Sequence, residues 1–388
     1  MFKHFPYVLF LCTIWCAFAA TLPAQNIDPR PVQVTATFVY PPSPLLQDGT
    51  QHLVYELLLT NFGSSTYILD SIDAKAADHT FSFSAADLKS LIRVLGAKPG
   101  EAPTETLEPG HSFVVFLTLD FDRADEIPHT IQHTIHFTAE DKSAHTIPAE
   151  LNVRDRAPII VAAPLRGSDW FAGGANGPDS YHRRALMVEG GHAWLAQRYA
   201  IDFAMFHMVN GKAFTWKGPE NQNSSYFCYD QPIYSVAPGK VVEVLDGLPE
   251  NVPHSGKLAI DLTWQNAGGN HVVIDIGFGL YAFYAHMRPG TVAVKQGDVI
   301  AAGQLLGHVG NTGSSSEPHL HFHIIDHPQF LSGQGVPYEF ANFSASPKID
   351  VQTIPNSDVI TFTSVGPLKP VQNEYPPENA AIDFPEPR

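Results

Sequence analysis

Three histidines recur at alternate positions in one short stretch of the chain: His319, His321 and His323. Alternate side chains of a β-strand point to the same face, so a strand here would carry all three imidazoles together. Residues two apart lie about 7 Å apart at Cα, so neighbouring imidazoles can serve one site, whereas the outer pair is too far apart to bind one small ion. The pattern predicts a metal or catalytic site rather than a chance cluster among the chain's 19 histidines. The opposite face would be apolar and suited to a core, formed by Leu320, Phe322 and Ile324.

Length and charge limit the classes of protein to consider. A chain of 388 residues with 44% hydrophobic residues fits two domains with ordinary cores. The formal net charge is -16 and no basic patch stands out, so we expect no nucleic-acid partner.

The N-terminus is typical of an export signal. Lys3 and His4 precede an apolar run from about Phe5 to Ala20, which ends in small residues. We interpret residues 1–20 as a signal peptide, because the run is short for a membrane span; an uncleaved anchor is the alternative. The expected product is exported, to the periplasm, cell envelope or medium, without stable membrane insertion. Cys228 would then be its single cysteine, without an internal disulfide and buried as a small apolar residue.

Residues 27–155 are expected to form a β-sandwich-like accessory domain, because apolar residues alternate in segments bounded by turn residues. The clearest segments are 52–61, 112–121 and 130–137. One helix is also expected, because residues 88, 91, 92 and 95 have helical spacing, Ser84 and Asp87 suit its start, and Gly96 ends it. The domain's role stays open between a spacer, a lid and a binding module.

Residues 168–345 are expected to form a second domain, an antiparallel β-sheet with tight glycine-containing turns. Prolines near 158 and 164 mark the boundary. Residues 346–388 are a Pro-rich acidic tail, expected to be extended or without fixed structure. The fold class predicted for the whole chain is therefore all-β dominated.

One long stretch of the second domain resembles a known family. The sequence YAFYAHMRPGTVAVKQGDVIAAGQLLGHVGNTGSSSEPHLHFHI resembles the core of the M23 metallopeptidases, the LytM/lysostaphin-type endopeptidases, and the resemblance covers roughly residues 190–325. Its YAH strand end, paired turns, GNTG loop and PHLHF strand follow the family's order. The resemblance implies a Zn²⁺ site on an antiparallel sheet, an exported location and cleavage of peptide bonds in peptidoglycan.

Site residues follow from that resemblance one at a time. His321 and Asp202 match zinc ligands, and His286 and His319 match the catalytic histidines. The family's other zinc ligand is a histidine four residues before the aspartate, where this chain has Arg198. A guanidinium stays protonated and has no lone pair to give, so Arg198 cannot bind zinc.

For the third ligand we propose His182, twenty residues before Asp202, because the intervening MVEGG turn signals allow the chain to double back. A Gln-Arg-aromatic-Ala-Ile-Asp run preceded by a His-Arg pair also resembles M23-like sequences. Arg198 would then pair with Asp202 or hold a substrate carboxylate. His323 is expected beside the ligands or in solvent. The other candidates for the third ligand are His192, His207 and His323, and the remaining possibility is that no third ligand exists.

Two functions remain open. The first is an exported zinc metalloendopeptidase that hydrolyses peptidoglycan peptides by metal-activated water. The alternative is a non-catalytic M23-like module that binds peptidoglycan or activates another cell-wall hydrolase. Retention of both His286 and His319 favours the enzyme.

Overall fold

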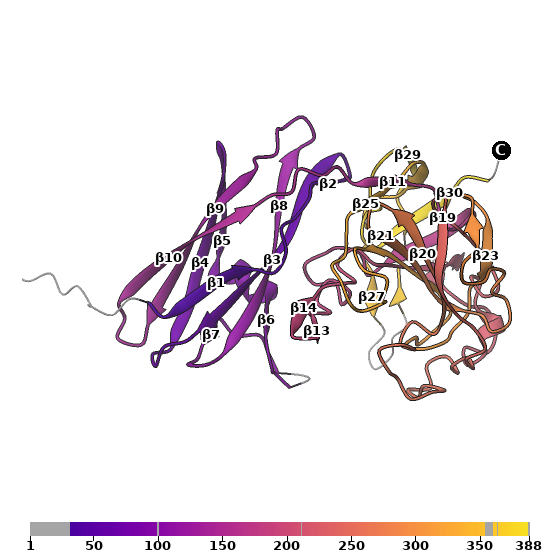
Figure 1. Cartoon of the computed structure of the whole chain (residues 1–388), viewed down its shortest axis with the longest axis horizontal. Coiled ribbons are helices and arrows are strands. Elements are labelled where there is room, and N and C mark those ends of the chain that lie inside the picture. Colours follow the sequence, from indigo (N-terminus) through magenta and orange to yellow (C-terminus); the bar gives the residue numbers. More distant parts are fainter. Residues whose placement is uncertain (1–31, 99–100, 211, 354–359, 363, 387–388) are drawn as a thin grey trace, which may run out of the picture. The chain divides into compact units, whose positions relative to one another are not determined.

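The computed structural model describes residues 32–98, 101–210, 212–353, 360–362 and 364–386, and residues 33–388 form one compact unit. The expected signal peptide, residues 1–20, lies outside the described residues. Strands dominate the part that is described, which confirms the all-β prediction (Figure 1). The helices of this part are α1 (Ala85–Leu91) and the short 3₁₀-helix η1 (Asn223–Ser225).

The N-terminal sandwich consists of two antiparallel five-stranded sheets. The first contains β1 (Val34–Phe38), β2 (Leu45–Gln47), β3 (Thr50–Asn61), β6 (Ile92–Val94) and β8 (Ser112–Asp122). The second contains β4 (Tyr67–Ala76), β5 (His79–Ser84), β7 (Thr106–Leu107), β9 (Thr130–Ala139) and β10 (Ala144–Asn152).

The two sheets of the sandwich meet through their predicted inward faces. Tyr55 on β3 and His133 on β9 approach to 2.8 Å between the hydroxyl oxygen and Nε2. The alternating apolar residues of the three segments predicted as strands are all buried, as their period of two requires. On β3 and β8, however, residues 53–57 and 113–117 are buried on both faces. Another part of the chain therefore covers the outer face of the first sheet, in addition to the second sheet on its inner face.

The helix α1 is shorter than the sequence predicts. Ser84 caps it, and Asp87 completes a capping box, as expected. The helix ends at Leu91 because Ile92 is extended and begins β6, where it pairs with β8. A β-branched residue packs well in a strand, and here tertiary pairing overrides the helical spacing.

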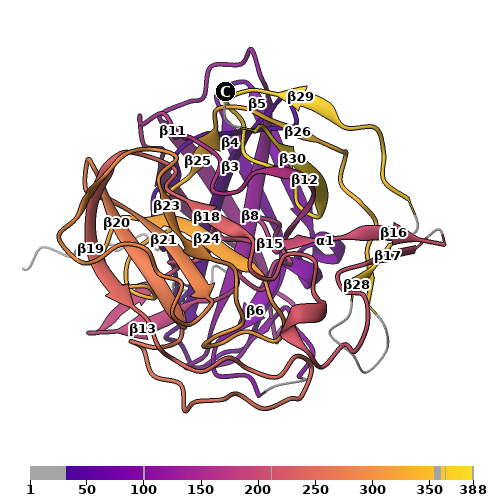
Figure 2. The ribbon, with the colours of Figure 1, turned by 90° about the vertical axis from the view of Figure 1, so that its right-hand side faces the viewer.

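The second part of the chain is built on a ten-stranded sheet, and Figure 2 shows β19, β20, β21 and β24 side by side within it. The order is β22 (Val299–Ile300), β19 (Gly239–Leu245), β20 (Asn270–Gly277), β21 (Leu280–Met287), β24 (Leu320–Ile325), β15 (Ile201–Met205), β12 (Gly167–Gly173), β30 (Ala380–Phe384), β26 (Phe343–Ala345) and β29 (Lys369–Val371).

The described residues also form five two-stranded sheets. One is parallel, β11 (Ile159–Val161) with β25 (Tyr338–Phe340). The others are antiparallel: β13 (Met187–Glu189) with β14 (His192–Trp194), β16 (His207–Val209) with β17 (Lys212–Phe214), β18 (Pro232–Tyr234) with β23 (Leu305–His308), and β27 (Gln352–Thr353) with β28 (Ile360–Thr361).

The C-terminal residues differ from the expectation of an unstructured tail. Strand β30 pairs with β12 on one side and with β26 on the other, and most of its side chains are buried. The ten-stranded sheet thus continues beyond residue 345. Ile382 and Phe384 supply apolar side chains to the main core, which the prolines around them obscure in the sequence.

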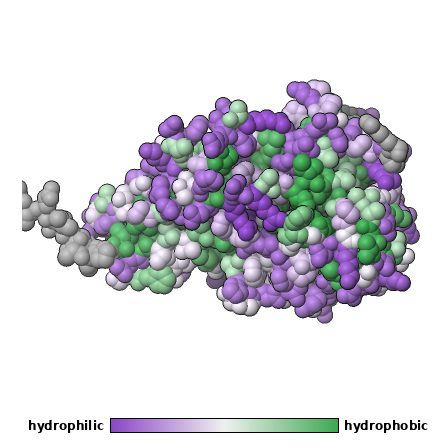
Figure 3. Space-filling view, turned by 45° about the horizontal axis from the view of Figure 1, so that its top comes forward, coloured by the Kyte–Doolittle hydropathy of each residue, from purple (hydrophilic) through white to green (hydrophobic). Residues whose placement is uncertain are grey.

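The surface mixes hydrophilic residues with apolar ones over the face shown in Figure 3. Several exposed apolar side chains belong to the segment between β19 and β20, namely Val252, Leu258, Leu262 and Trp264. Within the described residues, no helix has both the length and the apolar composition to cross a membrane.

Glu339 on β25 gives the fold a dependence on pH. Its Oε1 accepts a hydrogen bond from the backbone N–H of Leu46 at 3.2 Å. Burial, helped by the charge of Glu374 and opposed by Leu46 and Arg123, raises the pKa of Glu339 to about 7. The folded state then holds more protons than the unfolded state between about pH 4.5 and pH 7, so stability falls as the pH rises through this window.

We expect Glu339→Gln to remove that loss of stability, which is at most about 3.5 kcal/mol because a shift of one pKa unit corresponds to about 1.4 kcal/mol. Urea unfolding of the parent and the variant from about pH 5 to about pH 8 measures it. If the free energy of unfolding changes equally with pH in the two proteins, the dependence on pH does not come from Glu339.

Candidate metal and catalytic site

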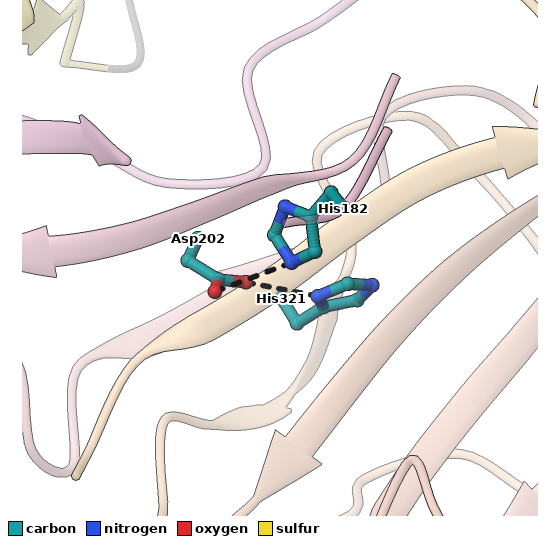
Figure 4. A group of neighbouring side chains, drawn as sticks. All are labelled: His182, Asp202 and His321. Carbon is teal, nitrogen blue, oxygen red and sulfur yellow. Dashed lines mark hydrogen bonds and ion pairs between the residues drawn. The ribbon is translucent and has the colours of Figure 1, made fainter. Parts of the chain in front are cut away.

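Two neighbouring strands bring the first two candidate ligands together. Asp202 lies on β15 and His321 on β24, and the two residues are direct partners in the antiparallel register. Directly opposed side chains on one face lie close enough to share an ion. Oδ1 of Asp202 is 2.8 Å from Nδ1 of His321 (Figure 4). The period-two histidine pattern therefore does place an imidazole against the carboxylate.

The third member of this group comes from the loop between β12 and β13. Nε2 of His182 lies 3.3 Å from Oδ2 of Asp202, on the same side as His321 (Figure 4). The donor atoms of His182, Asp202 and His321 all lie within 4.8 Å of one another. Two imidazoles and a carboxylate are a donor set that zinc accepts, so these residues fit the metal that the sequence implies.

Hydrogen bonds fix which nitrogen of each imidazole faces this group. Nδ1 of His182 lies 2.7 Å from the carbonyl oxygen of Gly174, so Nδ1–H donates there and Nε2 keeps its lone pair. Nδ1 of His321 faces Oδ1 of Asp202, and its Nε2 lies 2.9 Å from Nδ1 of His323. In the tautomer whose proton is on Nε2, that proton is donated to His323 and Nδ1 has a lone pair for a metal. Gly174 has a φ of +64°, and a Cβ there would lie only 2.9 Å from Nδ1 of His182. A side chain at position 174 would therefore displace the imidazole.

His286 and His319 stand beside the three candidate ligands. Their ring centroids are 4.8 Å apart. Nδ1 of His286 lies 2.7 Å from the carbonyl oxygen of Thr312, and Nδ1 of His319 lies 2.8 Å from that of Glu317. Each ring therefore presents Nε2 to the site, and Nε2 of His319 is 3.4 Å from Oδ1 of Asp202. Both are placed to accept or donate a proton next to a bound ion.

The GNTG loop has to approach β20 closely to hold His286. Gly313 has a φ of +73°, and a Cβ there would lie 2.2 Å from the backbone nitrogen of Gly269. This contact brings the carbonyl of Thr312 within reach of His286. His286 itself has a φ of +62°, an uncommon backbone conformation for a residue with a side chain. The loop and the strand end thus jointly orient this imidazole.

Asp202 carries the negative charge of the site. Burial alone would raise its pKa, but His182 and His319 outweigh burial and hold the pKa of Asp202 well below its ordinary value. Burial opposes protonation of His319, yet Asp202 prevails and raises the pKa of His319 to about 8. Burial, with the nearby His319 and His321, lowers the pKa of His286 well below its ordinary value. The two candidate catalytic imidazoles therefore differ strongly in their tendency to hold a proton.

A cleft of about 590 Å³ opens onto the five residues. Its polar lining includes Ser314, Ser315 and Ser316, and its apolar lining includes Trp264 and Phe330. The volume falls in the range of small-ligand sites.

Tyr181 is a cleft residue that sequence reasoning missed. Its hydroxyl donates to Oδ2 of Asp202 at 2.5 Å, while 61% of the residue remains exposed. Its position directly before His182 was the signal in the sequence, because neighbouring residues of one turn can both contact the carboxylate of Asp202.

The structure places Arg198 away from this cluster. Its guanidinium donates to Glu56 on β3, with Nη2 at 2.7 Å from Oε2, instead of pairing with Asp202 or facing the cleft as expected. His323 is buried and touches His321. Of the other rivals for the third ligand, His192 is exposed on β14, and His207 on β16 faces Asp169 at 3.4 Å.

Residues 225–332 match the model of peptidase family M23. This confirms the resemblance found in the sequence. His286, His319 and His321 lie inside the matched segment, whereas His182 and Asp202 precede it.

Three curated relatives show similarity to part of the chain. Lysostaphin from Staphylococcus simulans is 30% identical over 149 residues, which cover 32% of this chain and 29% of lysostaphin. Glycyl-glycine endopeptidase ALE-1 from Staphylococcus capitis is 37% identical over 78 residues, which cover 20% of this chain and 21% of ALE-1. Peptidoglycan DD-endopeptidase ShyA from Vibrio cholerae is 30% identical over 107 residues, which cover 28% of this chain and 20% of ShyA. The match thus spans less than a third of each relative's own length.

Proposed function

We propose that the protein is an exported zinc metalloendopeptidase that hydrolyses peptide bonds of peptidoglycan. The observation that carries the proposal is the convergence of His182, Asp202 and His321 within 4.8 Å, with His286 and His319 beside them in one cleft. The names of the similar relatives, a glycyl-glycine endopeptidase and a peptidoglycan DD-endopeptidase, support this reaction and this class of substrate.

The roles follow from the atoms that face the cleft. Nε2 of His182, the carboxylate of Asp202 and Nδ1 of His321 would hold the metal, and three protein ligands leave a position open. Zinc bound there would lower the pKa of a water molecule and polarise the scissile carbonyl. Nε2 of His286 and Nε2 of His319 can accept the proton of the attacking water or donate a hydrogen bond to the developing oxyanion. Apolar side chains such as Trp264 and Phe330 line part of the cleft and can contact apolar parts of a substrate.

Metal removal tests the proposal directly. Purified mature protein should contain about one zinc ion per chain and release soluble peptides from purified peptidoglycan. Dialysis against a strong chelator should abolish that release, and added zinc should restore it, because the reaction needs the metal-activated water. The measurements are metal content by mass spectrometry and newly exposed amino groups in the peptidoglycan.

A different result would favour the second function. Protein that binds peptidoglycan, contains no zinc and releases no peptide would be a non-catalytic module. Such a module has no chemical need for both His286 and His319 beside an intact ligand set.

A further inference from the structure

We propose that the N-terminal sandwich completes the zinc site: Glu56 on β3 positions the ligand His182 by holding the neighbouring Arg183. This inference rests on the zinc site proposed above. It gives the sandwich a role that the sequence leaves open, as a part of the peptidase rather than a separate module.

A buried ionic cluster joins the sandwich to the loop that carries His182. Glu56 and Arg183 are fully buried, and Arg198 is 2% exposed. Nε of Arg183 donates to Oε1 of Glu56 at 3.2 Å, and Nη2 of Arg198 donates to Oε2 at 2.7 Å. One carboxylate thus serves two guanidinium groups in the interior, where a buried charge without a counter-charge is costly.

Arg183 makes further contacts with the sandwich. Nη2 donates to the carbonyl oxygens of Tyr55 at 3.1 Å and Leu117 at 2.6 Å, and Nη1 donates to the hydroxyl of Thr118 at 2.9 Å. These acceptors lie on β3 and β8, whose outer face is buried in this region. The covering of that face is therefore, in part, the segment that contains the proposed ligand.

The same guanidinium fixes the loop around the ligand. Nη1 of Arg183 also donates to the carbonyl of Asn176 at 3.3 Å, and Nδ1 of His182 is held by the carbonyl of Gly174 at 2.7 Å. Both carbonyls belong to the turn that follows β12. Because His182 and Arg183 are consecutive, a shift of the guanidinium would move the imidazole away from Asp202.

The same cluster connects the proposed ligand His182 with Arg198, the residue at the position of the family's zinc-binding histidine. Arg198 stands where the M23 resemblance would place a zinc-binding histidine, and it is held by the same Glu56 that holds Arg183. One carboxylate from the sandwich thus fixes both features of the variant site. Without it, the two buried guanidinium groups would lose their shared counter-charge, which is costly in the interior.

The test compares zinc affinity in full-length mature variants, measured by competition with a chelator of known affinity. Glu56→Gln keeps the shape of the side chain and removes its charge. We expect zinc binding about 10- to 100-fold weaker, as for other groups that orient a metal ligand, and an altered visible spectrum of the Co²⁺-substituted protein. A purely structural role would lower thermal stability without changing the coordination spectrum.

Glu374→Gln is the matched control. Glu374 also ties the C-terminal residues to the sandwich, through Arg123 at 3.0 Å and the backbone N–H of Gly49 at 3.1 Å. The Glu374→Gln variant should be less stable than the parent but should keep the parental zinc affinity. Thr118→Val is a milder change, which removes one hydrogen-bond acceptor of Arg183, and should weaken zinc binding several-fold. If Glu56→Gln does not fold, the zinc affinity of Thr118→Val tests whether Arg183 positions His182.

The outcomes separate this inference from the function on which it rests. A folded Glu56→Gln protein with parental affinity and spectrum would overturn the inference, as would unchanged affinity in Thr118→Val when Glu56→Gln cannot fold. A parental protein that binds no zinc would instead refute the proposed function itself.

Discussion

Replacing His286 or His319 with alanine should lower the rate of peptidoglycan hydrolysis by about 10²- to 10⁴-fold, the contribution of a general acid–base or oxyanion-stabilising group. Zinc content should stay at the parental level, because neither residue belongs to the His182, Asp202 and His321 group. Steady-state rates on purified peptidoglycan, with metal content on the same samples, measure both quantities.

His271 provides the control for that experiment. It is a buried histidine on β20 whose Nδ1 lies 2.8 Å from the carbonyl oxygen of Gly269, so its environment resembles that of His286. It lines a separate hollow beside Glu243 rather than the cleft. His271→Ala should therefore lose stability but keep its rate per folded molecule. Parental hydrolysis in His286→Ala or His319→Ala would show that the residue concerned takes no part in the reaction.

Local patterns in the sequence were sufficient for much of the fold. Alternation of apolar residues predicted β3, β8 and β9. The histidine row predicted β24, which carries His321 and His323 and begins directly after His319. A strand's period of two follows from its own backbone geometry, so it is readable without knowledge of the partners. The M23 resemblance supplied the rest of the expected site residues.

Features that depend on distant partners were not readable. Glu56 lies 142 positions before Arg198, and nothing local marks it as the partner of a buried cation. In the sequence it is a polar residue in an alternating strand, which would ordinarily face solvent. Strand β30 was missed for a related reason, since its place between β12 and β26 is a tertiary pairing at the far end of the chain.

His182→Ala should remove the metal altogether at zinc concentrations that saturate the parent. The substitution deletes one of three ligands, so the loss should exceed the roughly 10- to 100-fold change expected from a group that only orients a ligand. Hydrolysis should fall with the metal, because the activated water requires it. Zinc per chain after gel filtration, followed by titration with Co²⁺, measures the loss.

The informative comparison is with His192→Ala, the rival for the same role. His192 lies on the hairpin of β13 and β14 beside Trp194, with ring centroids 5.5 Å apart and the rings tilted at 42°. It lies ten residues before Asp202, nearer in sequence than His182, so sequence distance alone would favour it. The structure instead brings Nε2 of His182 to 3.3 Å from Asp202, because the carbonyl of Gly174 orients the ring. His192→Ala should keep full zinc and full activity; if it loses both while His182→Ala keeps both, the ligand assignment is wrong.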